Sequence, residues 1–265
     1  MCRHLAYLGP RAPLGRVLVD PPHSLFRQSW EPRRQRYGTV NADGFGVGWY
    51  APGDPVPARY RRSGPVWADP SFADLARVVR SGAVLAAVRD ATEAGADGEA
   101  AAAPFAAGRW LFSHNGAVSG WPGSMAALTA RLPPARLLEL EARTDSAFVW
   151  ALVLHRLRAG EEAGRALAAA VADVAAAAPG SRLNLLLTGG DTIAATAWGD
   201  TLWYLAEPGG PTVVASEPYD DDPRWREVPD RTLLAATRTD VLLTPLDGSG
   251  GLRPPAGADV RSPHR

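Results

Sequence analysis

The chain has 265 residues, enough to bury a large hydrophobic core in one domain or in two small ones. Its 28 basic residues, all arginine, balance 28 acidic residues, so no excess of charge predicts binding to a nucleic acid or a membrane surface. A single cysteine excludes an internal disulfide and a zinc site built from several cysteines, and it fits a reducing cytoplasm. No apolar run approaches the roughly 18 residues of a membrane-spanning helix, and the amino-terminal residues do not resemble a signal peptide.

The first half of the chain predicts short strands separated by turns and by two helical segments. The glycines at every second position between Asn41 and Tyr50 lack the following helix of a nucleotide-binding loop, so they predict a strand that another segment approaches closely. The Ala/Gly-rich stretch from Gly95 to Pro104 predicts a mobile loop. Arg33 to Arg36 predicts a solvated loop. The other expected elements are strands at Cys2 to Leu8 (closed by Gly9-Pro10), Arg59 to Arg62, Ala83 to Val88 and Trp110 to Phe112, a helical turn over Leu25 to Trp30 capped by Ser24, and a helix that starts near Asp69-Pro70 and stops at Gly82.

The second half predicts helices first and strands afterwards. Helices are expected over Ser124 to Leu132, Leu137 to Ala142, Ser146 to Leu157 and Glu161 to Ala178, and strands over Leu183 to Leu187, Thr192 to Trp198, Thr201 to Leu205, Thr212 to Ala215, Leu233 to Ala236 and Val241 to Leu243. Gly189-Gly190-Asp191 and Gly199-Asp200 are expected as hairpin turns. This order predicts an α+β fold of two stacked, mainly antiparallel sheets with helices outside. We expect one domain over residues 1–247 and a frayed tail over 248–265.

Cys2 is the candidate nucleophile because of its position in the chain. Removal of Met1 leaves a thiol and a free α-amine on the same residue. The amine, with a pKa of roughly 7.7–8.0, can take the proton of the thiol near neutral pH. The alternative is a small buried residue in the first strand, which is the more common fate of a lone cysteine.

Four other positions offer the groups that such a nucleophile needs. Asn115 and Gly116 can donate an amide N–H and a backbone N–H to one oxyanion, although Asn-Gly is also a strong hairpin signal. Arg89 follows an apolar strand and can hold a carboxylate, or it is a surface residue. Asp145 can hold an ammonium group, or it caps the next helix. His114 and Asn115 are neighbours on an expected strand and point to opposite faces, which argues against a Cys-His-Asn relay.

The order of these motifs resembles the class II glutamine amidotransferase family. Cys at position 2 is followed by R-x-x-T at 89–92, H-N-G at 114–116 and T-D-S at 144–146. The resemblance implies the N-terminal-nucleophile hydrolase fold, a four-layer αββα sandwich, with Cys2 as the nucleophile and Asn115 and Gly116 as the oxyanion pair. It also implies that Arg89 and Thr92 bind the glutamyl α-carboxylate and that Asp145 binds the α-amine. Glu93 stands where many members have histidine, a difference that concerns the outer pocket.

A narrower resemblance concerns the substrate. The segments Cys2 to Leu5, Asn41 to Trp49, Val66 to Phe72 and Ala215 to Pro218 are similar to the branch of this family that acts in ergothioneine biosynthesis. That branch implies a stand-alone hydrolase that releases glutamate from γ-glutamyl-hercynylcysteine sulfoxide, a small molecule, without cofactor or metal. Trp30, Trp49 or Trp67 could meet the trimethylammonium of the leaving group, or all three belong to the core or its rim.

Two other functions stay open. One is a glutaminase subunit that delivers ammonia to a separate synthase. The other is a non-catalytic γ-glutamyl-binding protein, which requires that Met1 is retained. A homo-oligomer is compatible with either.

Overall fold

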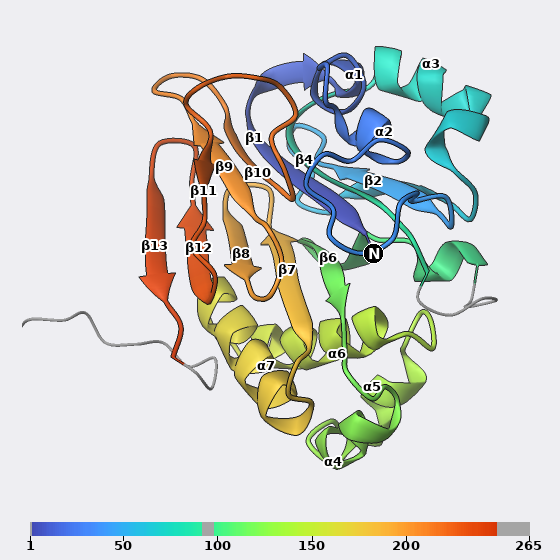
Figure 1. The fold of residues 1–265 in the computed structure, drawn as a ribbon, viewed down its shortest axis with the longest axis vertical. Helices are drawn as coiled ribbons and strands as arrows, with labels where there is room; N and C mark the ends of the chain where they lie inside the picture. The colour runs from blue at the N-terminus through green and yellow to red at the C-terminus, as the bar shows by residue number, and fades with distance from the viewer. Residues whose placement is uncertain (1, 92–97, 248–265) are drawn as a thin grey trace, which may run out of the picture.

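Two antiparallel β-sheets stacked face to face form the centre of the molecule (Figure 1). The computed structural model describes residues 2–91 and 98–247. In these residues sheet A has the strand order β11-β9-β10-β1-β4-β2-β3 and sheet B the order β13-β12-β8-β7-β6-β5. Sheet A consists of β1 (Arg3–Pro13), β2 (Phe45–Trp49), β3 (Ala58–Arg62), β4 (Arg80–Val88), β9 (Trp203–Ala206), β10 (Thr212–Ala215) and β11 (Arg226–Glu227). Sheet B consists of β5 (Phe105–Ala107), β6 (Trp110–Ala117), β7 (Arg182–Thr188), β8 (Ile193–Ala197), β12 (Thr232–Ala236) and β13 (Val241–Pro245).

Helices cover the outer face of each sheet, which gives the layer order α, β, β, α (Figure 1). The helices on sheet A are α1 (Leu14–Leu18), α2 (Leu25–Gln28) and α3 (Pro70–Val78). The helices on the sheet B side are α4 (Ala126–Thr129), α5 (Pro134–Leu138), α6 (Asp145–Arg158) and α7 (Ala163–Ala177). Short 3-10 helices are η1 (Val66–Ala68), η2 (Gly98–Ala101) and η3 (Gly123–Met125). The predicted α+β sandwich of mainly antiparallel sheets is confirmed.

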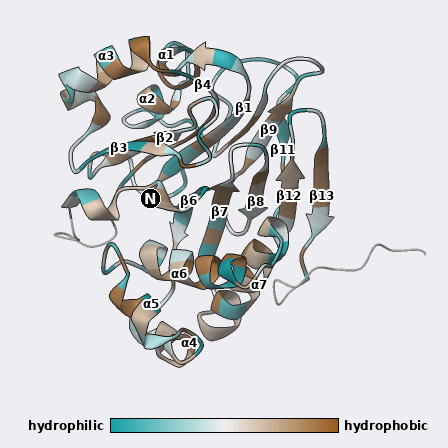
Figure 2. Cartoon of the chain, turned by 180° about the vertical axis from the view of Figure 1, so that it is seen from behind, coloured by the Kyte–Doolittle hydropathy of each residue, from teal (hydrophilic) through white to brown (hydrophobic). Residues whose placement is uncertain are grey.

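The three interfaces between these layers are separate hydrophobic clusters. Along β1, Leu5 packs toward the helices on sheet A, whereas Leu8 packs between the sheets with Leu111 of β6. On the other side of sheet B, Phe112 stacks on Trp150 of α6 with ring centroids 5.0 Å apart. Because the central strands are buried on both faces, they have continuous apolar runs, which appear brown in Figure 2.

The ends of the helices on sheet A follow their sequence signals. The Ser24 hydroxyl accepts a hydrogen bond from the Arg27 N–H and caps α2. The Asp69 carboxylate accepts from the N–H groups of Ser71 and Phe72, and Pro70 occupies the first turn of α3. Both predictions are confirmed.

Strand β2 is a glycine-bearing strand against which another segment packs. A Cβ on Gly46 would lie 2.3 Å from the carbonyl oxygen of Ala103, and one on Gly48 would lie 2.6 Å from a methyl carbon of Leu111. The predicted close approach is confirmed. Residues 95–97 of the Ala/Gly-rich stretch lie outside the described residues. The remainder is not a loose loop: it contains η2, and Ala102 is fully buried.

Three predicted breaks fall inside strands instead. Strand β1 runs past Gly9-Pro10 with a register shift between Leu8 and Ala12, because its pairing with β4 resumes after the irregularity. Helix α3 ends at Val78, and Gly82 lies within β4. The Asn115-Gly116 pair lies within β6, where it pairs with β7, so it is not a hairpin turn.

The two predicted turns of the carboxyl-terminal half differ. The turn at 189–191 joins β7 to β8, which are paired neighbours, so this hairpin is confirmed. Gly199-Asp200 joins β8 of sheet B to β9 of sheet A, so the hairpin predicted there is wrong. The chain crosses between the sheets at this point, and Asp200 is only 6% exposed.

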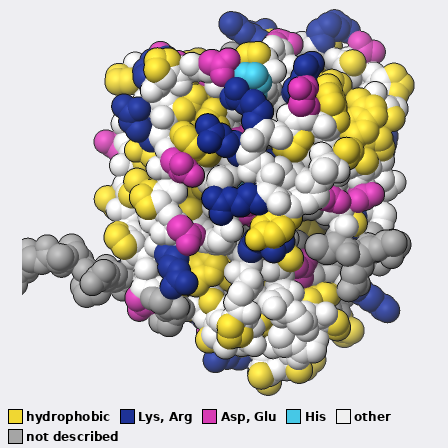
Figure 3. Space-filling view, viewed as in Figure 1, with side chains coloured by type: hydrophobic (Ala, Val, Ile, Leu, Met, Phe, Trp, Pro, Cys, Tyr) yellow, Lys and Arg dark blue, Asp and Glu magenta, His cyan; other side chains and the backbone are white. Residues whose placement is uncertain are grey.

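Two predictions concern the organisation of the chain as a whole. The tail at 248–265 lies outside the described residues, and the single domain over 1–247 stays a prediction. Among the described helices, none is long and apolar enough to cross a bilayer. Basic and acidic side chains are intermixed on the face shown in Figure 3.

Candidate active site

The ends of several strands and helix α6 surround a cavity of about 240 Å³ that contains the Cys2 side chain in its wall. The cavity lies where β1 begins, where β4 and β6 end, and where α6 begins. Four of the predicted site residues line it: Cys2, Arg89, Gly116 and Asp145. Residues separated by more than 140 positions in the sequence therefore meet at one site.

Cys2 lies directly before β1 and is partly exposed to the cavity. Burial raises the pKa of its thiol, while a backbone hydrogen bond from Asp90 and the charge of Arg89 lower it. The thiol is thus protonated at rest and needs a base to become a nucleophile. This favours a mechanism in which the residue's own α-amine takes the proton.

Arg89 follows the last residue of β4 and lies at the cavity wall. The N–H of Arg89 donates to the carbonyl of Gly44, and its Nη1 donates to the carbonyl of Asp43 at 3.2 Å. The Asp43 carboxylate accepts from the N–H of Ala91 at 2.8 Å. The contact with the Asp43 carbonyl holds the guanidinium, and the assignment of Arg89 to a substrate carboxylate stays a prediction.

Gly116 lines the cavity, whereas Asn115 does not. Asn115 is fully buried, and its Nδ2 donates to the Ser216 hydroxyl at 3.3 Å. A Cβ on Gly116 would lie 1.9 Å from the carbonyl oxygen of Arg182, so β6 and β7 come too close there for any side chain. Position 116 therefore has to be a glycine, and the role of Asn115 and Gly116 as an oxyanion pair stays a prediction.

Asp145 is the first residue of α6 and does not cap it. Thr144 is the cap, since its hydroxyl accepts from the Ala147 N–H at 3.2 Å. Asp145 Oδ2 accepts from the Val118 N–H at 2.9 Å, and Oδ1 accepts from the Ser146 N–H at 2.7 Å. The capping alternative for Asp145 is thus wrong, and its carboxylate is held at the cavity wall.

Thr92, predicted to shape the carboxylate pocket, and Glu93 lie outside the described residues. The role of Thr92 stays a prediction.

Neither nearby histidine is arranged as a general base for Cys2. His114 points away from Asn115, with Nδ1 3.0 Å from the Ser146 hydroxyl and Nε2 2.9 Å from the carbonyl of Arg182. His4 is fully buried, and burial together with the charge of Arg3 lowers its pKa to about 3. The rejection of a Cys-His-Asn relay is consistent with these contacts.

Several residues around the site were not singled out from the sequence. Trp121 and Arg143 line the cavity, whereas Trp30, Trp49 and Trp67 do not. Trp30 and Trp67 instead contact each other edge to face, with ring centroids 5.6 Å apart. Lone aromatic and basic residues carry no local pattern that distinguishes a cavity wall from a core or a surface.

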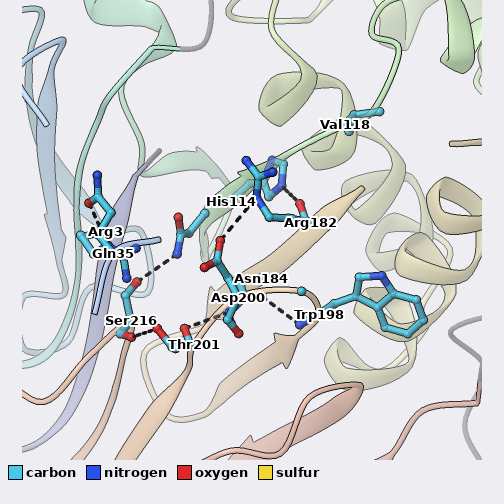
Figure 4. A network of polar contacts seen from close by, with 12 residues as sticks. Arg3, Gln35, His114, Val118, Arg182, Asn184, Trp198, Asp200, Thr201 and Ser216 are labelled. Carbon is cyan, nitrogen blue, oxygen red and sulfur yellow. Dashed lines mark hydrogen bonds and ion pairs between the residues drawn. The ribbon is translucent and has the colours of Figure 1, made fainter. Parts of the chain in front are cut away.

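A buried polar layer around Arg3, the residue after Cys2, was also missed, and Figure 4 shows Arg3 and Gln35 of this layer. Arg3 is fully buried, and its Nε donates to Gln35 at 3.2 Å. The Glu217 carboxylate, also fully buried, accepts from the N–H groups of Arg33 and Arg34. The loop over 33–36 therefore has exposed arginine side chains, as predicted, but its backbone is fastened to the interior.

Comparison with known proteins decides the family. The model of the class II glutamine amidotransferases matches residues 18–211. The chain belongs to the class II glutamine amidotransferases. The predicted resemblance is thereby confirmed, and the αββα sandwich is the N-terminal-nucleophile fold of this family.

Two mycobacterial relatives cover nearly the full chain. The protein named gamma-glutamyl-hercynylcysteine sulfoxide hydrolase in Mycolicibacterium smegmatis is 44% identical over 93% of this chain and 100% of its own length. The protein of the same name in Mycobacterium tuberculosis is 42% identical over 96% of this chain and 100% of its own length.

Solved amidotransferase structures share the fold. A class II glutamine aminotransferase domain protein from Silicibacter pomeroyi superposes with a TM-score of 0.63 at 25% identity, over 91% of this chain and 98% of that one. The glutamine phosphoribosylpyrophosphate amidotransferase of Bacillus subtilis has the same TM-score at 14% identity, over 91% of this chain but only 48% of that one.

Proposed function

We propose that this protein is a γ-glutamyl amidohydrolase that converts γ-glutamyl-hercynylcysteine sulfoxide to glutamate and hercynylcysteine sulfoxide. The observation that carries the proposal is the meeting of Cys2, Arg89, Gly116 and Asp145 around one cavity, in a chain with near-full-length relatives of that name. An opposed pair of charges, Arg89 and Asp145, suits the α-carboxylate and α-ammonium of a glutamyl group. We place the reaction in the reducing cytoplasm, where the Cys2 thiol stays free.

The proposed reaction begins once Met1 has been removed. The α-amine of Cys2 takes the thiol proton, and the thiolate attacks the γ-carbonyl carbon of the substrate. The Gly116 N–H and the Asn115 amide stabilise the oxyanion. The C–N bond breaks as the leaving amine takes the proton, and a γ-glutamyl thioester remains on Cys2. Water then attacks the thioester, which releases glutamate and restores the thiol.

The deciding experiment has two parts. Intact-mass measurement of the purified protein establishes whether Met1 has been removed, and glutamate release is then measured with γ-glutamyl-hercynylcysteine sulfoxide and with glutamine. We expect the processed protein to have the larger kcat/KM on the sulfoxide. Preference for glutamine would favour an ammonia-supplying glutaminase, and a protein that retains Met1 and binds without turnover would favour a γ-glutamyl-binding protein.

Replacing Arg89 with lysine is expected to weaken substrate capture. Lysine keeps the positive charge but loses the two parallel N–H donors that match a carboxylate. We expect KM to rise by roughly tenfold or more, in line with about 1.5–3 kcal/mol for a charged hydrogen bond, with a smaller change in kcat. Steady-state kinetics on the sulfoxide substrate provide the measurement. An unchanged KM would contradict the assignment of Arg89 to the carboxylate.

Trp121 is proposed as the wall of the cavity that receives the trimethylammonium of the leaving group. It lines the cavity, and its ring packs 5.8 Å from that of Phe148, which holds the indole in place. Replacement by leucine should raise KM for the sulfoxide substrate by about tenfold, because a cation–π contact with a desolvated cation is worth roughly 1–2 kcal/mol. KM for glutamine, which has no such cation, should change little. Trp67→Leu, at a residue outside the cavity, is the matched control. Equal losses on both substrates would contradict this role.

A further inference from the structure

Ser216 connects the strand that follows the nucleophile to the strand that carries the oxyanion pair. It lies directly after β10 and is fully buried. Its N–H donates to the carbonyl of His4 at 2.9 Å, and its hydroxyl accepts from the N–H of His4 at 3.0 Å. On the other sheet, the same hydroxyl meets the Asn115 amide. Ser216 therefore links β1 in sheet A to β6 in sheet B two residues from Cys2.

Hydrogen bonds hold both the backbone and the hydroxyl of Ser216 in place. Besides its two bonds with His4, its carbonyl accepts from the Thr201 hydroxyl at 2.9 Å, the contact drawn beside Ser216 in Figure 4. Thr201 lies in the segment that crosses from sheet B to sheet A after β8. The Ser216 backbone is thus held at both its N–H and its carbonyl, and the His4 N–H holds its hydroxyl, so the hydroxyl can impose an orientation on the Asn115 amide.

In this orientation of the Asn115 amide, some of its polar atoms and those of Ser216 lack a hydrogen-bond partner. Its Nδ2 donates to Ser216, while its Oδ1 is buried without a partner among the described residues. The Ser216 oxygen then accepts from two N–H groups, and no acceptor for its own hydrogen occurs in the described part of the chain. A hydroxyl offers one donor, and a buried carbonyl oxygen without a donor is costly.

Turning the amide by 180° gives the Ser216 hydrogen an acceptor and Oδ1 a donor, and it moves the position without a partner to Nδ2. The nitrogen and oxygen of an asparagine amide are assigned from their hydrogen bonds rather than by shape. In the turned arrangement the Ser216 hydroxyl donates to Oδ1, and Nδ2 takes the position where no described protein atom accepts from it. That position is buried, so an Nδ2 N–H placed there needs an acceptor, and a substrate oxygen that reaches it would supply one.

We propose that Ser216 is a positioning residue for the oxyanion hole: its hydroxyl donates to Asn115 Oδ1 and so directs the Asn115 N–H toward the reacting carbonyl. This inference rests on the proposed function. It adds to that function a residue of sheet A, outside the oxyanion pair itself, that determines which end of the amide the reaction meets. A preset donor contributes most when charge develops on the oxygen, so Ser216 should affect kcat rather than substrate capture.

The test is a double-mutant cycle on Ser216 and Asn115, with kcat and KM measured on the γ-glutamyl substrate that the wild-type protein turns over. Ser216→Ala should lower kcat by about tenfold to a hundredfold, with KM changed by less than about threefold. Ser216→Thr, which keeps a hydroxyl, should restore most of kcat. Because Ser216 acts through Asn115, the double variant should have the kcat of Asn115→Ala alone.

The matched control is Ser81→Ala. Ser81 is equally buried, and its hydroxyl bonds to the backbone of Tyr50 and Ala83, far along β4 from Arg89. It should lose stability as Ser216→Ala does, yet keep kcat. If Ser216→Ala does not fold, Ser216→Cys keeps the shape with a much weaker donor and should show the same lowered kcat at unchanged KM.

Three results would overturn the inference: an unchanged kcat in Ser216→Ala, a change confined to KM, or losses that multiply in the double variant. Failure of the proposed function is a different observation, because then the wild-type protein releases no glutamate from either substrate. In that event this inference falls with it.

Discussion

Replacing Cys2 with alanine is expected to abolish glutamate release while leaving the fold intact. The thiol is the group that forms the proposed thioester, so its removal takes away the nucleophile. We expect kcat to fall by about 10⁴-fold or more, as when the nucleophile of a covalent hydrolase is removed. Glutamate release by the purified variant is the measurement, with circular dichroism and thermal unfolding as checks of the fold.

Stability should change little in this variant, because Cys2 is partly exposed and precedes β1 rather than packing in the core. The α-amine is also retained. Cys2→Ser is the informative companion: it keeps a nucleophilic atom of higher pKa and should retain only a trace of activity. Substantial turnover by Cys2→Ala would refute the thioester mechanism and with it the role of the amino-terminal residue.

Replacing Gly116 with alanine is expected to cost both stability and activity. The new Cβ would lie 1.9 Å from the carbonyl oxygen of Arg182 and 2.6 Å from His114 Nε2. Since the first of these atoms belongs to the backbone of β7, relief requires that the two strands separate. We expect the free energy of unfolding to fall by at least about 3 kcal/mol, in the range of severe overpacking, and glutamate release to be lost.

The control for this variant is Gly64→Ala, at a glycine where an added Cβ would meet nothing within 4 Å. It should unfold at nearly the wild-type denaturant concentration. Chemical denaturation of the two variants under the same conditions makes the comparison. If Gly116→Ala were as stable as Gly64→Ala, the close approach of β6 and β7 would not be a property of the protein in solution.

Local patterns predicted the elements well where the physical cause is local. The caps at Ser24 and Asp69 and the strand at β4 depend on neighbours within a few residues, so the sequence contains their cause. The errors arose where a local signal competes with a distant partner. Asn115-Gly116 has the signal of a turn, yet pairing with β7 extends the strand through it.

The residues of the candidate site also divide into those that the sequence predicted and those that it did not. Cys2, Arg89, Gly116 and Asp145 were predicted because their types and order match a known set, and the cavity contains all four. Trp121 and Ser216 were missed, because a lone tryptophan or serine becomes part of a site only through what lies next to it.

By itself, the sequence determined the position of the one thiol, the order of the motifs that resemble a known family, and a fold of two stacked, mainly antiparallel sheets with helices outside. Only the tertiary structure decided which of these groups meet, that Gly116 lines the cavity while Asn115 is fully buried, and that Ser216, which follows β10, bonds to the Asn115 amide on the other sheet. The physical reason is that hydrogen bonding and apolar periodicity act along short stretches, whereas strand order and the crossing between sheets bring together residues a hundred positions apart.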